Sequence, residues 1–489
     1  MINPFKKIKK DKKKIESVEI VSYFSGVAKA KGLTEVFLNE VLIDKDQKPR
    51  ALVIGFDDYF IDLIFLEKDV DLNQKLFRSY KTFTIKVSED LIGRVVNGLG
   101  EPKDGLNYIL GDFIDVFQKA PQIIDRQPIT RSLITGIKVI DTSLPLGKGQ
   151  RELIIGDRKL GKTTIAQDIV LNQKYNRDEV ICIYVAIGQE KQKIQELLSL
   201  LDKHNSFLYT IVVASTADSA LAEQFLSPFV GCSIGEHFRS LGKDVLIVYD
   251  DLTKHGKVYR DISLLLERSP GREAYPGDIF SLHANLLERA GQLSKKNGGG
   301  SLSALPIVET QEGDLTTFIP TNLISITDGQ IYLERDLFQK GFLPAINIGL
   351  SVSRIGSQAQ PNNLTEVVGS IRLTWAQYKE LAKLIRLQTN LTDVVQNKVL
   401  RGELILELLK QNKHTYFSWM EQMVLFYAIN EGFFDHLEKE KLLEVENLLL
   451  KFLNLKYKKL ITDIRMVNFS SKLKLKIDKF LSDFQKEFL

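Results

Sequence analysis

A glycine loop between an apolar run and a helical pattern restricts the fold of this chain more strongly than any other segment. Residues 152–155 have the pattern of a buried strand, residues 156–163 read GDRKLGKT, and residues 164–170 have helical periodicity. In this order, strand, loop and helix form a phosphate-binding loop, because backbone N–H groups and the positive end of the helix dipole surround phosphate oxygens. The sequence therefore predicts an α/β domain in which a parallel sheet has a nucleotide site at the end of one strand.

The loop contains most of the predicted ligands of this site. We expect Lys162 to neutralise phosphate charge and the Thr163 hydroxyl to ligate Mg²⁺. Farther along, an apolar strand at residues 245–249 ends in Asp250, which we predict to hold the same ion through water, although an acidic pair after a strand is equally typical of a turn. The predicted nucleotide-binding residues of the loop are Gly156, Asp157, Arg158, Lys159, Leu160, Gly161, Lys162, Thr163 and Thr164.

The position expected to activate water is an amide in this chain. Hydrolysis of a triphosphate needs a group beyond the γ-phosphate that orients and deprotonates water, but the strand at residues 180–187 leads to Gly188 and Gln189. A glutamine side chain cannot accept that proton at neutral pH. Glu190 follows, yet neighbouring side chains of an extended segment face opposite ways, so we do not expect it to substitute. The sequence predicts that the chain binds ATP or ADP with Mg²⁺ without hydrolysing it efficiently.

Composition divides the chain into four segments. At 489 residues the chain is too long for one hydrophobic core, so several domains are expected. Residues 1–16 form a basic tail, residues 17–84 alternate short strands and turns as in a β-barrel, and residues 85–361 alternate strands with helical patterns. Pro361 is the last proline, which favours a helical bundle over residues 362–489.

Charge and hydropathy exclude several other classes of protein. A formal net charge of +4 is too small for the whole chain to bind a polyanion. The lysine run at residues 6–14 reads first as a solvated tail, with a membrane-surface or nucleic-acid contact as the alternative. There is no run of eighteen apolar residues and no signal or transit pattern, and the two cysteines have no metal-ligand spacing. We expect a protein of the reducing cytosol with no nucleic-acid partner.

Six longer segments resemble the alpha subunit of F1-type ATP synthases. They are residues 149–158 (GQRELIIGDR), 184–189, 249–252, 270–278, 325–330 and 344–356 (PAINIGLSVSRIG). The resemblance implies a RecA-like nucleotide domain between a β-barrel and C-terminal helices, in a hexameric ring of alternating alpha and beta subunits around a central gamma-type shaft. It also implies that beta sites perform the chemistry, that Arg354 is an arginine finger for the neighbouring subunit, and that Pro344 and Gln411 lie near the base. The ring would lie at the cytoplasmic face of a bacterial membrane, which the chain contacts only through the complex.

The chain departs from the family at a few positions. Lys159 and Leu160 stand where the family loop has glutamine and threonine, Leu343 replaces an arginine, and Lys413 replaces one of two glutamines near the base. At the N-terminus, a lysine run stands in place of the amphipathic helix by which alpha subunits bind the peripheral stalk. This difference puts the peripheral-stalk contact in doubt and indicates a variant complex that is attached differently.

Three functions are compatible with these patterns. The first is an alpha subunit in an ATPase coupled to proton transport, and the second is a subunit of an F1-like ATPase that drives other mechanical work, such as gliding motility. The third is a Rho-like hexameric RNA translocase, which would need an RNA-binding barrel with exposed aromatic residues and its own catalytic glutamate. Tyr59 and Phe60 are the only aromatic hint in the barrel segment, and Gln189 argues against the third function.

Overall fold

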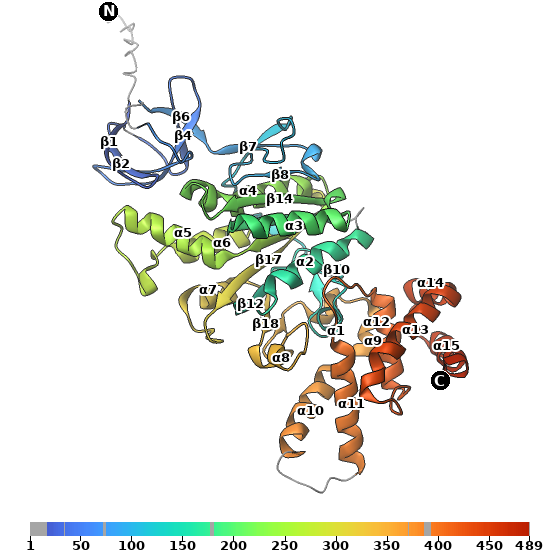
Figure 1. Ribbon diagram of the computed structural model, residues 1–489. Helices are drawn as coiled ribbons and strands as arrows, with labels where there is room; N and C mark the ends of the chain where they lie inside the picture. Colours follow the sequence, from blue (N-terminus) through green and yellow to red (C-terminus); the bar gives the residue numbers. More distant parts are fainter. Residues whose placement is uncertain are drawn as a thin grey trace, which may run out of the picture.

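Three structural regions follow one another along the computed structural model of the chain, from the blue N-terminal sheet to the red C-terminal helices (Figure 1). The structure describes residues 17–33, 35–71, 75–176, 180–369, 371–385 and 393–488. The predicted basic tail at residues 1–16 lies outside the described residues. Within them, the predicted α/β domain and C-terminal helices are confirmed, and the segment predicted as a β-barrel is an antiparallel sheet that is consistent with a barrel but not closed.

The N-terminal region is an antiparallel sheet of six strands in the order β1-β2-β5-β4-β3-β6. Ser17, just before the edge strand β1, forms an isolated bridge with Phe77 of the other edge strand, β6. The sheet therefore curls toward a barrel without a continuous closing ladder among the described residues. The segments VAKAK and FRSYKT form strands with little apolar signal in the sequence. The bounds are β1 (Glu19–Phe24), β2 (Val27–Lys31), β3 (Glu40–Ile43), β4 (Pro49–Phe56), β5 (Ile61–Phe65) and β6 (Phe77–Thr82).

The middle region is built on a nine-stranded sheet within the described residues, in the order β19-β18-β12-β17-β15-β13-β14-β8 with β16 beside β17. All pairs are parallel except those of β16 and β19, as expected where helices connect successive strands. The bounds are β8 (Val95–Val96), β12 (Leu153–Asp157), β13 (Val180–Gln189), β14 (Thr210–Thr216), β15 (Asp244–Asp250), β16 (Gly291–Gln292), β17 (Ser301–Thr310), β18 (Gly329–Leu333) and β19 (Val352–Ser353).

Helices cover both faces of this sheet because its strands are apolar on both sides. Along β13, Cys182 and Tyr184 pack into the core beneath α2 and α3, whereas Ile183 and Val185 pack beneath α4 to α7. Successive strand residues point to opposite faces, so one continuous apolar run fills two cores. The bounds are α1 (Lys138–Ser143), α2 (Lys162–Asn172), α3 (Lys191–Lys203), α4 (Leu221–Ser240), α5 (Leu252–Leu265), α6 (Ile279–Leu287), α7 (Phe318–Ile326) and α8 (Arg335–Gln339), with small sheets of β7 (Thr84–Val87) and β9 (Asp112–Asp115) and of β10 (Ser132–Leu133) and β11 (Leu146–Gly147).

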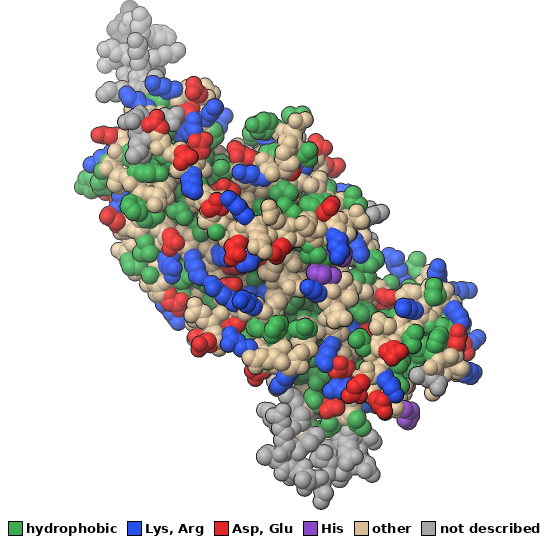
Figure 2. All heavy atoms as spheres, viewed as in Figure 1, with side chains coloured by type: hydrophobic (Ala, Val, Ile, Leu, Met, Phe, Trp, Pro, Cys, Tyr) green, Lys and Arg blue, Asp and Glu red, His purple; other side chains and the backbone are tan. Residues whose placement is uncertain are grey.

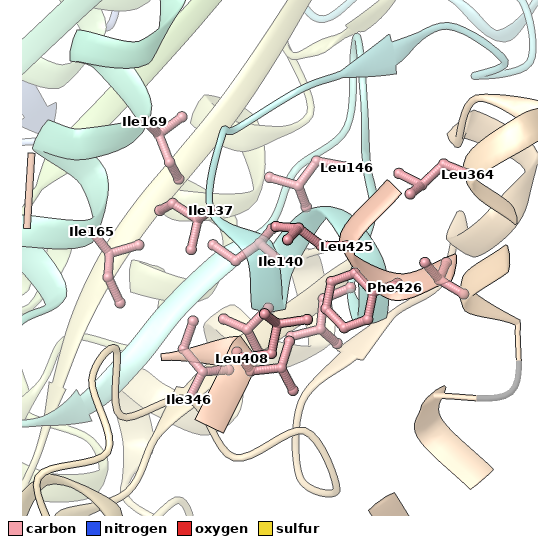
Figure 3. Close-up of a cluster of buried hydrophobic side chains, with 14 of the residues drawn as sticks. Ile137, Ile140, Leu146, Ile165, Ile169, Ile346, Leu364, Leu408, Leu425 and Phe426 are labelled. Atoms are coloured by element: carbon pink, nitrogen blue, oxygen red, sulfur yellow. The ribbon is translucent and has the colours of Figure 1, made fainter. Parts of the chain in front are cut away.

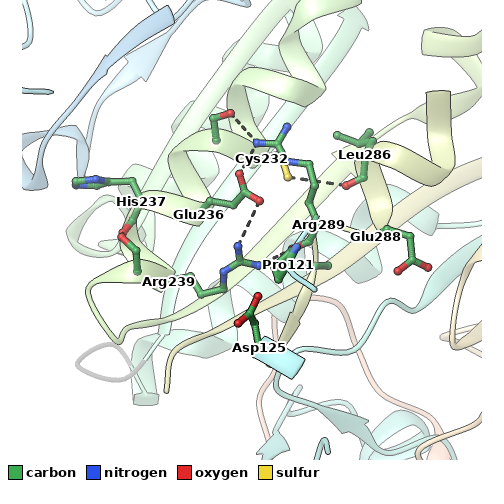
Figure 4. Close-up of polar contacts among 12 residues, drawn as sticks. Pro121, Asp125, Cys232, Glu236, His237, Arg239, Leu286, Glu288 and Arg289 are labelled. Carbon is green, nitrogen blue, oxygen red and sulfur yellow. Dashed lines mark hydrogen bonds and ion pairs between the residues drawn. The ribbon is translucent and has the colours of Figure 1, made fainter. Parts of the chain in front are cut away.

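A buried ionic cluster joins α4 to the segments on either side of it (Figure 4). Arg289, which is 1% exposed, pairs with Glu236 and donates hydrogen bonds to the Val116 carbonyl and the Ser233 hydroxyl, both at 2.8 Å. Arg239 pairs with the same carboxylate at 3.3 Å. Buried charges are tolerated when they are paired in this way, so the cluster fixes α4 against the chain that enters from β9.

The C-terminal region consists of helices at the end of the molecule opposite the N-terminal sheet (Figure 1). Their bounds are α9 (Asn362–Val368), α10 (Ile371–Ile385), α11 (Asp393–Leu409), α12 (Trp419–Asn430), α13 (Leu442–Lys456), α14 (Lys458–Met466) and α15 (Ser471–Phe488). Helix α12 starts at a capping box in which Ser418 and Glu421 satisfy each other's backbone N–H groups. No helix among the described residues has both the length and the apolar character needed to cross a membrane. Basic and acidic side chains are interspersed on the face seen in Figure 2.

The helical region is attached to the α/β domain by an apolar cluster around α1 and by one buried ion pair. Ile137 and Ile140 meet Leu408 and Phe426 in this cluster (Figure 3). Beside it, the Lys138 ammonium lies 2.6 Å from a carboxylate oxygen of Glu446 on α13, with neither side chain more than 2% exposed. Burial lowers the pKa of Lys138 and raises that of Glu446. Since both groups are cut off from water, each depends on the other for its charge to be tolerated.

Candidate functional site

The glycine loop joins β12 to α2 at the carboxyl edge of the sheet. Gly161 has φ +97°, in the left-handed region that favours glycine. Helix α2 begins directly afterwards at Lys162, which is 6% exposed and donates a hydrogen bond of 2.6 Å to the Asp157 carbonyl. Burial lowers the pKa of Lys162, while the carboxylates of Glu309, Asp251 and Asp250 oppose that shift. The loop thus places an ammonium and the first N–H groups of a helix at one point, an arrangement suited to phosphate.

A cavity of about 820 Å³ opens over this loop, a volume within the range of small-molecule sites. Of the predicted loop ligands, Arg158, Lys159, Gly161, Lys162, Thr163 and Thr164 line it. Gly156, Asp157 and Leu160 do not. The Asp157 carboxylate instead accepts from Thr310 at 2.7 Å and pairs with Arg335 at 2.9 Å, and Leu160 packs in the core. These two side chains therefore stabilise the loop through contacts with other parts of the chain and do not line the cavity.

Asp250 lies next to Thr163, as the predicted magnesium site requires. The Thr163 hydroxyl donates to Asp250 Oδ2 at 3.2 Å, and Tyr184 donates to the same oxygen at 2.7 Å. Burial raises the pKa of the Asp250 carboxyl. A hydroxyl and a carboxylate side by side are the hard oxygen donors that Mg²⁺ prefers, so the residues fit a nucleotide-bound magnesium ion. The neighbouring Asp251 caps α5 through the Lys254 N–H at 2.8 Å, and burial together with Asp250 raises its pKa to about 7.

Gln189 is fixed on both sides of its amide at the end of β13. Its Nε2 donates to the carbonyl and to Oδ1 of Asp250, both at 3.1 Å, and its Oε1 accepts from the Lys254 ammonium at 2.6 Å. Sequence reasoning missed Tyr184 and Lys254, whose partners are distant along the chain. The Lys254 ammonium takes one of the two lone pairs of Oε1, and an amide oxygen is too weak a base to accept a proton from water at neutral pH. The position therefore orients Asp250 instead of accepting a proton.

Each carboxylate that lines the cavity already has a donor from the described part of this chain. Glu190 pairs with Lys193 at 3.0 Å, which lowers the pKa of Glu190. Glu309 pairs with Arg158 at 2.8 Å. The remaining ones are Asp250 and Asp251, described above, and Glu196, which accepts from Gln192 at 2.9 Å.

The two residues predicted to lie near the base do not line the cavity. The Gln411 amide bonds to backbone groups of Lys138, Gly136 and Thr415 at 2.8–3.0 Å. Its backbone N–H donates to the Leu343 carbonyl, directly before Pro344. Lys413 and His414 line the cavity instead, and His414 is tied to Asp168 of α2 at 2.9 Å. Gln411 therefore has a structural role in this conformation, which the sequence did not indicate.

Arg354 follows β19 at the opposite end of the sheet from the glycine loop. β19 pairs with the first residues of β18, Gly329 with Ser353, whereas the loop follows the last residue of β12. β12 and β18 run parallel, with Leu153 beside Gln330 and Gly156 beside Leu333. Five strand residues at about 3.3 Å each separate the two ends by roughly 17 Å. The Arg354 side chain is exposed and has no ion pair among the described residues. The arginine and the loop of one chain thus lie at opposite ends of the sheet.

Comparisons with known proteins extend over almost the whole chain. Residues 136–353 match a family model described as the ATP synthase alpha/beta family, nucleotide-binding domain, and residues 360–484 match the ATP synthase alpha/beta chain, C terminal domain. A protein of Clostridium botulinum (strain Hall) named ATP synthase subunit alpha is 45% identical over 97% of this chain and 94% of its own length. Proteins with the same name from Petrotoga mobilis and Rickettsia bellii are both 42% identical, over 95% and 96% of this chain and 95% and 94% of their own lengths. The phosphate loop, the sheet and the helical region all fall within these matches, and the chain therefore belongs to the ATP synthase alpha/beta family.

Proposed function

We propose that this chain is the alpha-type, non-catalytic nucleotide-binding subunit of an F1-type rotary ATPase. The observation that supports a non-catalytic role is the Gln189 amide, which is held between Asp250 and the Lys254 ammonium where a water-activating carboxylate is required. The complete phosphate loop beside it supports retention of a nucleotide. The names of the relatives support the assignment to the alpha subunit.

In this proposal the chain alternates with catalytic beta-type subunits in a hetero-hexameric ring around a gamma-type shaft. Arg354 supplies its guanidinium to the site of the neighbouring subunit, since it lies away from the loop of its own chain. A planar guanidinium can bind two phosphate oxygens at once, which makes arginine suited to this role. The complex would lie at the cytoplasmic face of a bacterial membrane and attach this chain to it only indirectly.

Within its own site, the chain would hold ATP or ADP together with Mg²⁺. Lys162 and the N–H groups at the start of α2 would bind the phosphates, and Thr163 and Asp250 would hold the metal, the latter through water. Bound Mg²⁺ would neutralise phosphate charge and so strengthen retention. Lys159 and Lys413 line the cavity as further cations, which would add to the attraction for the polyphosphate.

Replacing Lys162 with alanine is expected to weaken binding of Mg-ATP to the isolated chain by about 10- to 200-fold, because a charge-assisted hydrogen bond is worth roughly 1.5–3 kcal/mol. Isothermal titration calorimetry measures this loss. In the assembled complex the same variant should keep substantial hydrolysis, since the chemistry occurs in the beta-type subunit. Lys191→Ala is the matched control, because Lys191 pairs with Asp218 on the surface outside the cavity.

The unmodified isolated chain is expected to turn over ATP negligibly. A steady-state phosphate-release assay on the purified chain measures this directly, with the loss of activity in Lys162→Ala as a check for contaminating ATPases. Rapid hydrolysis that disappears in the Lys162→Ala variant would contradict the non-catalytic role.

We further propose that the complex couples ATP synthesis or hydrolysis to proton transport. The relatives are named ATP synthases, and synthesis of ATP is uphill, so it needs an external source of free energy such as an ion gradient. ATP-driven quenching of a pH-sensitive dye in inverted vesicles that contain the complex tests this coupling. A complex that hydrolyses ATP there without proton uptake would favour other mechanical work, such as gliding motility.

A further inference from the structure

A chain of buried and partly buried hydrogen bonds fixes the backbone directly before Arg354. The Ser353 hydroxyl donates to the Pro145 carbonyl at 2.8 Å and accepts from Gln150 Nε2 at 3.0 Å. The same Nε2 donates to Glu152 Oε2 at 2.8 Å, and Gln150 Oε1 accepts from the Gly147 N–H at 2.8 Å. Gln150 is 2% exposed and Glu152 is fully buried. The short strand β19 is therefore tied to the residues that precede β12.

A second anchor holds the backbone of Arg354 itself. The Arg354 N–H donates to the Asp328 carbonyl at 2.9 Å. The Asp328 carboxylate accepts from Arg151 through the backbone N–H at 3.0 Å, Nε at 3.1 Å and Nη2 at 2.8 Å. The two anchors fix the backbone at Ser353 and Arg354, whereas the Arg354 side chain is exposed.

Glu152 is unusual because half of its carboxyl group has no partner. Its Oε1 atom is buried without a hydrogen bond from the described residues. A Cβ atom on Gly329 would lie 2.6 Å from Glu152 Oε2 and 2.1 Å from the Val352 carbonyl, so the carboxyl group lies directly beneath the pairing of β18 with β19. Of the charged groups around it, Asp328 raises the pKa of Glu152 and Arg354 lowers it, but burial dominates and raises it strongly. The more this pKa is raised, the weaker is the attraction of the carboxyl group for the guanidinium of its own chain.

We propose that Gln150, Glu152 and Ser353 are positioning residues that hold Arg354 in the direction of the neighbouring subunit's catalytic site. The inference rests on the proposed function, in which Arg354 acts on that neighbour. Misplacement of a catalytic group by about 1 Å can lower a rate by about 100-fold, so a small change in the support of β19 has a measurable effect.

The test is a double-mutant cycle in the assembled complex. Ser353→Ala removes the hydroxyl and is expected to lower kcat for ATP hydrolysis about tenfold with little change in KM, because the arginine acts on the transition state. In the Arg354→Ala background, Ser353→Ala should have no further effect on kcat. Ser357→Ala is the matched control, since this serine is exposed and its hydroxyl has no hydrogen bond among the described residues.

The outcomes separate this inference from the proposed function. If Arg354→Ala leaves hydrolysis unchanged, the proposed function fails. If Arg354→Ala lowers hydrolysis about 10³-fold but Ser353→Ala lowers kcat by the same factor in both backgrounds, the network has only a structural role and the inference is overturned.

Glu152→Gln tests the neutral form of the carboxyl group without creating a cavity. The amide still offers an oxygen to Gln150, so kcat should remain within about twofold of the unmodified complex. Glu152→Ala removes that oxygen and should reproduce the loss in Ser353→Ala. A tenfold loss of kcat in Glu152→Gln, with thermal unfolding unchanged, would show that the support of Arg354 depends on a charged carboxylate at position 152.

Discussion

Arg354→Ala is expected to lower steady-state ATP hydrolysis by the assembled complex about 10³-fold or more. Arginine fingers contribute about 10³ to 10⁵ in rate in phosphoryl-transfer enzymes, because they stabilise the charge that develops on the transferred group. The side chain is exposed and has no ion pair within the described part of its own chain, so its removal breaks no ion pair there. An ATPase assay coupled to oxidation of NADH, on complexes of verified subunit composition, measures the loss.

Two controls make this result specific. Arg354→Lys keeps the positive charge but loses the planar pair of donors, so its rate should fall between those of the unmodified and alanine complexes. Arg465→Ala removes another exposed arginine, on α14, and should leave the rate unchanged. A complex with Arg354→Ala that assembles normally and keeps more than a tenth of its activity would rule out the arginine-finger role.

Lys138→Met is expected to lower the free energy of unfolding of the helical region by about 3–5 kcal/mol, the usual cost of leaving one partner of a buried ion pair unpaired. Glu446, whose side chain is 2% exposed, would then have no counter-charge. Trp375 and Trp419 are the two tryptophans of the chain and both lie in this region, so their fluorescence during urea denaturation reports its unfolding.

The pH dependence of this variant has a definite sign. Burial already raises the pKa of Glu446 in the folded chain, and loss of the ammonium raises it further. A carboxyl group whose pKa is higher in the folded state stabilises that state most at low pH, and stability falls as the pH rises from the unfolded toward the folded pKa. The destabilisation should therefore be larger at pH 8 than at pH 5.

A matched surface pair and a double variant complete this experiment. Lys441 and Glu438 form an ion pair whose side chains are 63% and 70% exposed, so Lys441→Met should cost less than about 1 kcal/mol. Replacing both Lys138 and Glu446 with methionine removes the uncompensated charge and should restore most of the loss. Equal effects of Lys138→Met and Lys441→Met would show that the buried pair does not stabilise the attachment of the helical region.

The parts of the fold that the sequence predicted are those in which local pattern and tertiary environment agree. The strand before the glycine loop, the loop and α2 have a fixed order and spacing, and β13 and β15 are apolar on both faces. The segments VAKAK and FRSYKT form strands through pairing with neighbours that the sequence places elsewhere. Their strand structure depends on non-local hydrogen bonds and not on their own composition.

The candidate site likewise contains residues that local motifs predict and residues that only the fold brings together. Lys162, Thr163 and Asp250 were predicted from motifs, and the structure places them together. The hydrogen bond from Lys254 to Gln189 joins residues 65 positions apart. No local sequence pattern indicates it, so it could be found only from the structure. Gln411 was predicted to lie near the nucleobase. In the structure its amide donates hydrogen bonds to backbone carbonyl groups of Gly136 and Thr415.

The distance between Arg354 and the phosphate loop gives the chain two unlike faces. A twofold contact pairs one surface patch with the same patch of a second copy, so it could bring an arginine to a loop only if both lay in that patch. In the proposed ring, a head-to-tail contact instead places Arg354 at the site of one beta-type neighbour, and repeated contacts of this kind form a ring where the rotation closes. In such a ring each subunit would contribute to the site of only one neighbour, so a defective subunit would inactivate the neighbour on one side and leave the other active.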